Sequence, residues 1–272
     1  MKTKSVFLVV LMTCFIMTGF AVKNSYAKKN ACGKEMTAAE MAERALDLQE
    51  IQNVMGMHQI LGSPGGDHDL ELEKYWAQKT PGVSFAHNVG VYFGIDVIRK
   101  YYGSGKSLQN SPQTEQTGQA PMMQAGGGNI SFRTLTTPII YIAGDGKTAK
   151  AYWYTPGFQA NIQNGEGSAI WTYEKYAIDF VKEDGAWKIW HFHVYNDWEI
   201  PMGADLAKYY IEQSKNPQTR QAPPIKEEFA KAYKGTVFGE PYSVTKVPNQ
   251  FKSPRMPEPY CTFSDTFSYA EE

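Results

Sequence analysis

The sequence predicts an α+β fold in which a long, curved antiparallel sheet wraps against three helices that precede it in the chain. Between residues 41 and 58, apolar side chains recur at three- and four-residue steps, a spacing typical of helices, and two further helical segments follow before residue 103. Four long strand-like runs follow, at 130–143, 149–162, 168–182 and 186–198, joined by Gly-, Asn- and Asp-rich connections that suit hairpin turns. Strands of this length bend and twist, so the helices can fill the concave side and form a roll.

The first helix is predicted to begin after Thr37, because Thr37-Ala38-Ala39-Glu40 has the form of a capping box. Its apolar face includes His58, and the Gly- and Pro-rich residues 62–66 end it. Asp67 can cap a second helix through about Lys79. A short strand at 83–87 and a third helix at 95–102 complete the N-terminal half.

Two further segments have compositions that predict surface positions. Residues 103–129 are rich in Gly, Gln and Ser, which predicts a flexible insertion, either a plain loop or a lid. After a helix at about 204–214, prolines dominate residues 217–259, with a short helix at 225–233 and an extended tail that wraps the surface. We therefore predict an N-terminal segment at 28–35, one domain at 36–203 and a C-terminal tail at 204–272.

The first 27 residues resemble a secretory signal. Lys2 and Lys4 precede an apolar run at 6–22, and Ser25-Tyr26-Ala27 suits signal peptidase. An uncleaved membrane anchor is the alternative. We expect an exported protein, periplasmic or extracellular, in which Cys32 and Cys261 could form a disulfide.

Net charge limits the class of partner. The formal charge is −1 and the pI is near 6.5, whereas phosphate contacts would favour a basic chain. We therefore expect no nucleic-acid partner, and a small uncharged or weakly charged molecule as the ligand.

The hairpin at 181–198 carries two of the five histidines. Asp184-Gly185 suits a tight turn, and alternation along a strand would place Trp187, Ile189, His191, His193 and Tyr195 on one side. Imidazole suits proton transfer near neutral pH, so this face is a candidate for catalysis. The alternative is that both rings are hydrogen-bonded parts of the sheet.

The order of these elements, together with Gly-Ile-Asp-Val-Ile at 94–98 and the hairpin DGAWKIWHFHVYND at 184–197, resembles the nuclear-transport-factor-2-like superfamily. Within it, the chain is most similar to SnoaL-like and scytalone-dehydratase-like bacterial proteins, over residues 36–201. The resemblance implies a cone-shaped barrel with a pocket between the concave sheet and the helices, and a homodimer. The superfamily includes dehydratases, isomerases and non-catalytic modules. The resemblance implies no cofactor and no metal.

The resemblance also implies site residues. Histidines on strands supply acid and base, and tyrosines orient the substrate. The catalytic candidates are His87, His193, His191 and His58, with His87 and His193 as the pair. The substrate-binding candidates are Tyr154, Tyr173, Trp153, Tyr92 and Asp96. An acid expected soon after the first helix has no clear match at 62–66, and Asp67 or Asp69 is a loose substitute.

Three functional hypotheses remain from the sequence. The first is an exported, cofactor-independent lyase of the dehydratase kind, or an isomerase, acting on a small hydrophobic or aromatic molecule by histidine acid–base catalysis. The high aromatic content would build an apolar pocket for it. The second is a non-catalytic periplasmic binding or assembly module. The third is a metal site at His191 and His193, completed by His87 or His58.

Overall fold

The computed structural model describes residues 28–63, 66–87, 90–102, 128–163, 166–215 and 254–271. The predicted signal segment, nearly all of the predicted insertion and the predicted helix at 225–233 lie outside the described residues.

The three predicted N-terminal helices are present. Helix α1, Ala38–Leu61, begins with the predicted capping box, in which the backbone N–H of Glu40 donates to Thr37 Oγ1 at 3.2 Å. Helix α2, His68–Tyr75, is capped by Asp67 and is shorter than predicted, because Trp76 has extended backbone that bridges to Ile189 in the sheet. Helix α3, Ile95–Tyr102, has the predicted bounds.

The strands form one seven-stranded sheet in the order β2-β1-β7-β6-β5-β3, with β4 also paired to β5. Their bounds are β1 Ser84–His87, β2 Gly90–Phe93, β3 Gly128–Arg133, β4 Thr136–Ile142, β5 Thr148–Gln163, β6 Glu166–Glu183 and β7 Ala186–Pro201. Pairing is antiparallel except between β1 and β7. The single run predicted at 130–143 is two strands, because β3 and β4 pair with different halves of β5.

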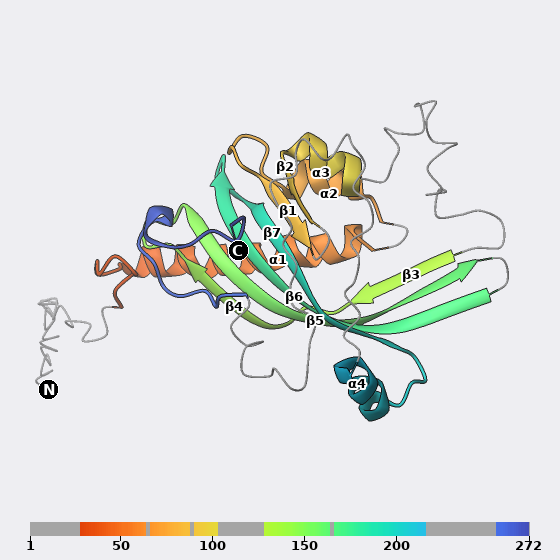
Figure 1. Cartoon of the computed structure of the whole chain (residues 1–272). Coiled ribbons are helices and arrows are strands. Elements are labelled where there is room, and N and C mark those ends of the chain that lie inside the picture. Colours follow the sequence, from red (N-terminus) through yellow and green to blue (C-terminus); the bar gives the residue numbers. More distant parts are fainter. Residues whose placement is uncertain are drawn as a thin grey trace, which may run out of the picture.

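The core lies between the concave side of the sheet and the N-terminal helices. Strands β5–β7 curve along α1, with α2 and α3 close to β1 and β2 (Figure 1). Ile51 and Met55 of α1 pack with Leu72 of α2 and Ile178 of β6, all fully buried. The predicted α+β roll is confirmed.

A bulge in β7 changes which side chains share a face. Phe180 pairs with Ile189 and Asp179 pairs with His191, so Trp190 is an extra residue on β7. One extra residue reverses the alternation beyond it. Trp187 and Ile189 are therefore in the concave-side core, whereas His191, His193 and Tyr195 lie on the convex side. The prediction that these five side chains share one face is wrong.

The C-terminal residues 254–271, here called the strap, pack on the convex side of the sheet. Asp179, fully buried, accepts a hydrogen bond from Lys150 Nζ at 2.5 Å and one from the backbone N–H of Tyr269 at 2.8 Å. His191 Nδ1 lies 2.8 Å from the same carboxylate, so Asp179 orients this imidazole ring. The Lys150 ammonium lies 4.2 Å from the Phe267 ring centroid. The described part of the tail thus wraps the surface as predicted.

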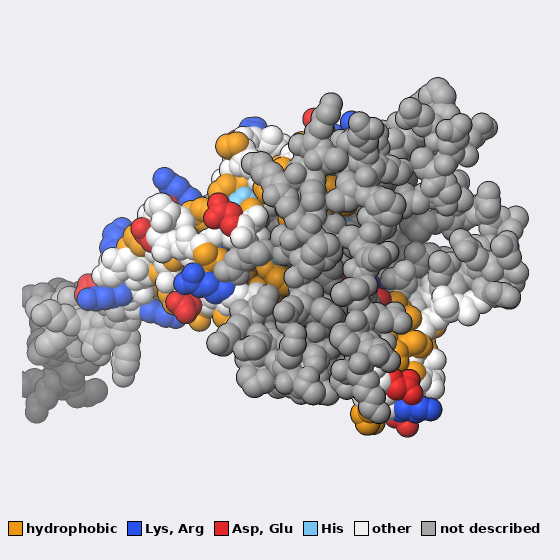
Figure 2. Space-filling model, in the orientation of Figure 1, with side chains coloured by type: hydrophobic (Ala, Val, Ile, Leu, Met, Phe, Trp, Pro, Cys, Tyr) orange, Lys and Arg blue, Asp and Glu red, His pale blue; other side chains and the backbone are white. Residues whose placement is uncertain are grey.

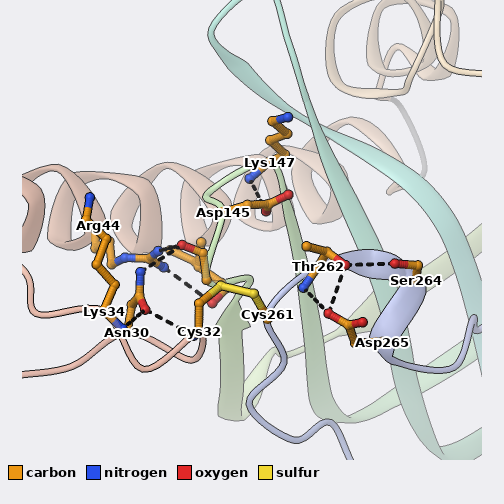
Figure 3. The surroundings of a disulfide bond; sticks show 12 residues. Asn30, Cys32, Lys34, Arg44, Asp145, Lys147, Cys261, Thr262, Ser264 and Asp265 are labelled. Carbon is orange, nitrogen blue, oxygen red and sulfur yellow. Dashed lines mark hydrogen bonds between the residues drawn. A yellow bond between two sulfur atoms is a disulfide. The ribbon is translucent and has the colours of Figure 1, made fainter.

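A disulfide joins the strap to the segment before α1 (Figure 3). The predicted partners, Cys32 and Cys261, form it, beside a turn that contains Gly144. Arg44 of α1 donates to the Gly144 carbonyl at 2.8 Å. A β-carbon at Gly144 would lie 2.2 Å from Cys32 Sγ, so only glycine permits this close approach.

The surface is mixed at both ends of the molecule. On the face in Figure 2, charged side chains of both signs lie at the N-terminal end of α1, and hydrophobic and charged side chains lie together near α4, Leu206–Lys215. Leu206 and Ile211 of α4 are about half exposed. Among the described helices, none is long and apolar enough to cross a membrane.

Candidate functional site

A cavity of about 620 Å³ lies on the concave side of the sheet. The last turn of α1, the end of α3 and the strands β1, β3, β5, β6 and β7 contribute its wall. This is the pocket position that the sequence resemblance implies.

His58 and Glu71 form a buried pair at this wall. His58 Nδ1 lies 2.7 Å from Glu71 Oε1, and the two side chains are 6% and 0% exposed. Trp76 Nε1 donates to the same oxygen at 2.8 Å, which fixes the carboxylate. A carboxylate at Nδ1 keeps the proton on that nitrogen and leaves Nε2 as the acceptor in the neutral ring. The arrangement suits a general base.

Aromatic rings enclose the His58 imidazole. The Phe192 ring centroid lies 4.8 Å from it and the Tyr176 centroid 5.9 Å, both edge to face. Tyr102 also lines the cavity, and burial together with the nearby Glu71 charge raises the pKa of its hydroxyl well above the ordinary value. Tyr102 is therefore a neutral hydroxyl at physiological pH.

An arginine–carboxylate pair occupies another part of the wall. Arg133 Nε and Nη2 donate to the two oxygens of Glu174 at 2.9 and 3.0 Å. Arg133 Nη1 donates to Ser131 Oγ. The Arg133 and Glu174 side chains are 14% and 8% exposed, so water screens this bidentate pair only weakly.

His87, at the end of β1, also lines the cavity. Burial lowers its pKa to about 4, so the ring is neutral at physiological pH. A neutral imidazole can accept or donate a hydrogen bond, but it adds no positive charge to the wall.

The predicted pair of His87 and His193 does not meet in one cavity. Ala86 of β1 is the register partner of His193, so His87, one residue further, points to the other face. The His193 ring stacks on Tyr195 with centroids 3.9 Å apart on the convex side, and burial lowers its pKa to about 3. The bulge at Trp190 is the reason for this correction. The three-histidine metal site fails for the same reason.

His191 likewise lies on the convex side, where Asp179 holds it. Of the four catalytic candidates, the structure brings only His58 and His87 to the cavity.

The five predicted substrate-binding residues lie outside the cavity wall. Tyr154 and Tyr173 pack against one another on the convex side, with ring centroids 5.4 Å apart. Trp153 and Tyr92 are core residues, 2% and 4% exposed. The Asp96 side chain is 86% exposed and forms an ion pair with Arg99 across one helical turn.

The sequence reasoning missed Glu71, Arg133 and Tyr102. The acid was expected within a few residues of His58. The turn between α1 and α2 instead brings Glu71, thirteen positions after His58, back to the histidine ring. The sequence held one signal of a buried polar residue on α2. Leu70 and Leu72 do not lie on one helical face, so the residue between them can also face the interior. Glu71 and Leu72 are both fully buried, so α2 presents a carboxylate to the interior as well as leucine.

Comparison with known families gives one match. Residues 71–193 match the SnoaL-like domain family. The chain contains a SnoaL-like domain. The matched segment of the SnoaL-like domain begins at Glu71, and the resemblance inferred from the sequence is confirmed. No curated protein matches the chain.

Solved structures with a similar arrangement have low sequence identity. The chain is 13% identical to the hexachlorocyclohexane dehydrochlorinase LinA-type3 of Novosphingobium barchaimii LL02, over 60% of this chain and 95% of that one, with a TM-score of 0.44. It is 12% identical to a protein of Streptomyces avermitilis that is described as a dehydratase from the NTF2-like family, over 59% of this chain and 99% of that one, with a TM-score of 0.40.

Proposed function

We propose that the SnoaL-like domain is a cofactor-independent lyase of the dehydratase kind, or an isomerase, that uses His58 as its base. The observation that supports this most is the 2.7 Å contact between His58 Nδ1 and Glu71 Oε1 at the cavity wall. A buried carboxylate behind an imidazole stabilises the imidazolium that forms when the ring takes a proton.

In the proposed reaction, His58 Nε2 takes a proton from a carbon next to a carbonyl group. The C–H electron pair moves toward that carbonyl, and the developing negative charge on its oxygen is stabilised by N–H groups of Arg133. In elimination, the pair then breaks the bond to a hydroxyl group on the neighbouring carbon, and the His58 imidazolium gives its proton to that oxygen, so that water leaves. In isomerisation, His58 returns the proton to a different carbon. Glu71 keeps its charge throughout and balances the imidazolium.

Export is also part of the proposal. The signal-like residues 1–27 support it, and so does the disulfide between Cys32 and Cys261, because disulfides persist in oxidising compartments. The substrate is then a small, mainly hydrophobic molecule that reaches the cavity outside the cytoplasm. The homodimer stays a prediction from the resemblance.

The test compares His58→Gln with His193→Gln, a histidine on the opposite face of the sheet. Purified protein is incubated in D₂O with a panel of cyclic and aromatic β-hydroxy ketones, and NMR follows deuterium uptake and elimination. We expect the wild type and His193→Gln to be active, and His58→Gln to lose about 100-fold or more, the usual contribution of a general base.

Equal activity of His58→Gln and the wild type would refute the proposal. If a stably folded His193→Gln variant lost activity while His58→Gln kept it, the active site would lie on the convex side of the sheet. Binding of the panel compounds by the wild type with no exchange or elimination would favour the non-catalytic binding module.

A further inference from the structure

The charges on the cavity wall restrict the class of molecule that can bind, an inference that rests on the proposed function at the same site. Arg133 is the arginine of this wall, and its charge is already balanced. Glu174 engages it through both carboxylate oxygens, at 2.9 and 3.0 Å. Because the pair is largely buried, a ligand meets a neutral ion pair at this point, and not an unbalanced cation.

Arg133 nevertheless keeps donors for a ligand. A guanidinium carries five N–H groups. Glu174 accepts from Nε and Nη2, and Ser131 accepts from Nη1, so one N–H on Nη1 and one on Nη2 remain. These two groups can hold a neutral oxygen acceptor without any change in the Arg133–Glu174 pair.

A second carboxylate increases the negative charge of the wall. Glu199 lines the same cavity, and its charge acts on Arg133. Glu71 lies behind His58 and adds a third carboxylate nearby. His87 contributes no compensating charge, because burial keeps its ring neutral. Among the described residues of the wall, a carboxylate or phosphate ligand would therefore meet more acidic side chains than arginines.

The remaining wall suits an apolar body. Phe85 and Phe192 both line the cavity, with ring centroids 5.6 Å apart in an edge-to-face arrangement. Tyr176 packs edge to face on Phe192 at 4.9 Å. Such rings bind flat apolar molecules through dispersion and edge contacts.

We propose that Glu174 determines ligand specificity by neutralising Arg133, so that the cavity takes uncharged molecules with a carbonyl or hydroxyl oxygen and rejects organic anions. Arg133 then donates its two remaining N–H groups to that oxygen. Removal of the Glu174 charge exposes a cation, which converts the cavity into an anion site.

The test uses two probes of the same shape, 2-naphthamide and 2-naphthoate, in calorimetric titrations at low salt and pH 7.5. We expect the wild type to bind the amide at least tenfold more tightly than the carboxylate. In Glu174→Gln, binding of the carboxylate should tighten at least tenfold, because charge-assisted hydrogen bonds are about twice as strong as neutral ones, while amide binding changes little. Glu73→Gln, an exposed carboxylate on α2, is the matched control and should leave both affinities unchanged.

Two further variants keep the test decisive. The double variant Arg133→Gln/Glu174→Gln should lose the gained carboxylate binding, because no cation remains. If Glu174→Gln does not fold, Glu199→Gln should tighten carboxylate binding about threefold through the same charge effect. Preference of the wild type for naphthoate, or no gain in Glu174→Gln, would overturn the proposal.

Selectivity is measured as the ratio of the two binding affinities in the wild type and in each of these variants. This readout needs no turnover, so failure of the catalytic proposal and failure of the charge proposal give different results.

Discussion

Replacement of Asp179 by Asn is the most informative test of how the strap is held. Asp179 is fully buried and neutralises Lys150, which is fully buried too. The asparagine amide keeps the shape but removes the carboxylate charge that lies 2.5 Å from the ammonium. Breaking a buried ion pair in this way costs about 3–5 kcal/mol of unfolding free energy. The Tyr269 backbone N–H also loses a charged acceptor, so we expect a loss near the upper end of that range.

The assay is urea unfolding followed by circular dichroism, with the disulfide intact. Asp179→Asn combined with Lys150→Met should recover about 2 kcal/mol, because the double variant buries no unpaired charge. Asp96→Asn is the control, since its side chain is 86% exposed, and it should change stability by less than about 1 kcal/mol. A loss below about 1 kcal/mol in Asp179→Asn, or no recovery in the double variant, would refute the reasoning.

Two other predictions concern the disulfide and the buried histidines. The double variant Cys32→Ser/Cys261→Ser opens a loop with a sequence separation of 229. In the chain-entropy model this lowers the free energy of unfolding by up to about 5 kcal/mol. Urea unfolding of the wild type and the double variant measures the loss, and equal unfolding midpoints would contradict the prediction. The pKa values of His87 and His193 fall from 6.5 to about 4 and about 3 on folding, so between pH 6.5 and pH 4 the unfolded chain binds more protons and stability declines as pH falls. Each histidine should contribute a slope of about 1.4 kcal/mol per pH unit, and His193→Gln should flatten the measured curve, whereas an unchanged slope would contradict the burial argument.

Local chemistry made much of the fold predictable. The Thr37–Glu40 capping box and the Asp67 cap are decided by residues within one helical turn of each other, and both occur as predicted. The hairpin at Asp184-Gly185 is equally local, because both residues adopt positive φ, which Asp and Gly tolerate better than most. Helix α3 and the long antiparallel strands follow from the same kind of short-range pattern.

The candidate site was less predictable, because it depends on tertiary contacts. His58, a catalytic candidate from the sequence, lines the cavity, but its partner Glu71 is identified only once α2 packs against α1. Arg133 and Glu174 come from strands that are separated by β5 in the sheet, so their pairing depends on how strongly the sheet curls. Without the extra residue Trp190, alternation along β7 would have placed His191, His193 and Tyr195 on the side of Trp187 and Ile189, as predicted.

Because Trp190 is an extra residue, the side of the sheet that a β7 side chain faces depends on whether the number of residues back to the hairpin turn is odd or even. A related chain with one residue fewer at this point would present its two imidazoles to the helices and its Phe192 and Val194 equivalents to the strap. The same local motif would then build an interior made of different chemical groups. An alignment that matches the two histidines without counting back to the hairpin turn would equate side chains on opposite sides of the sheet.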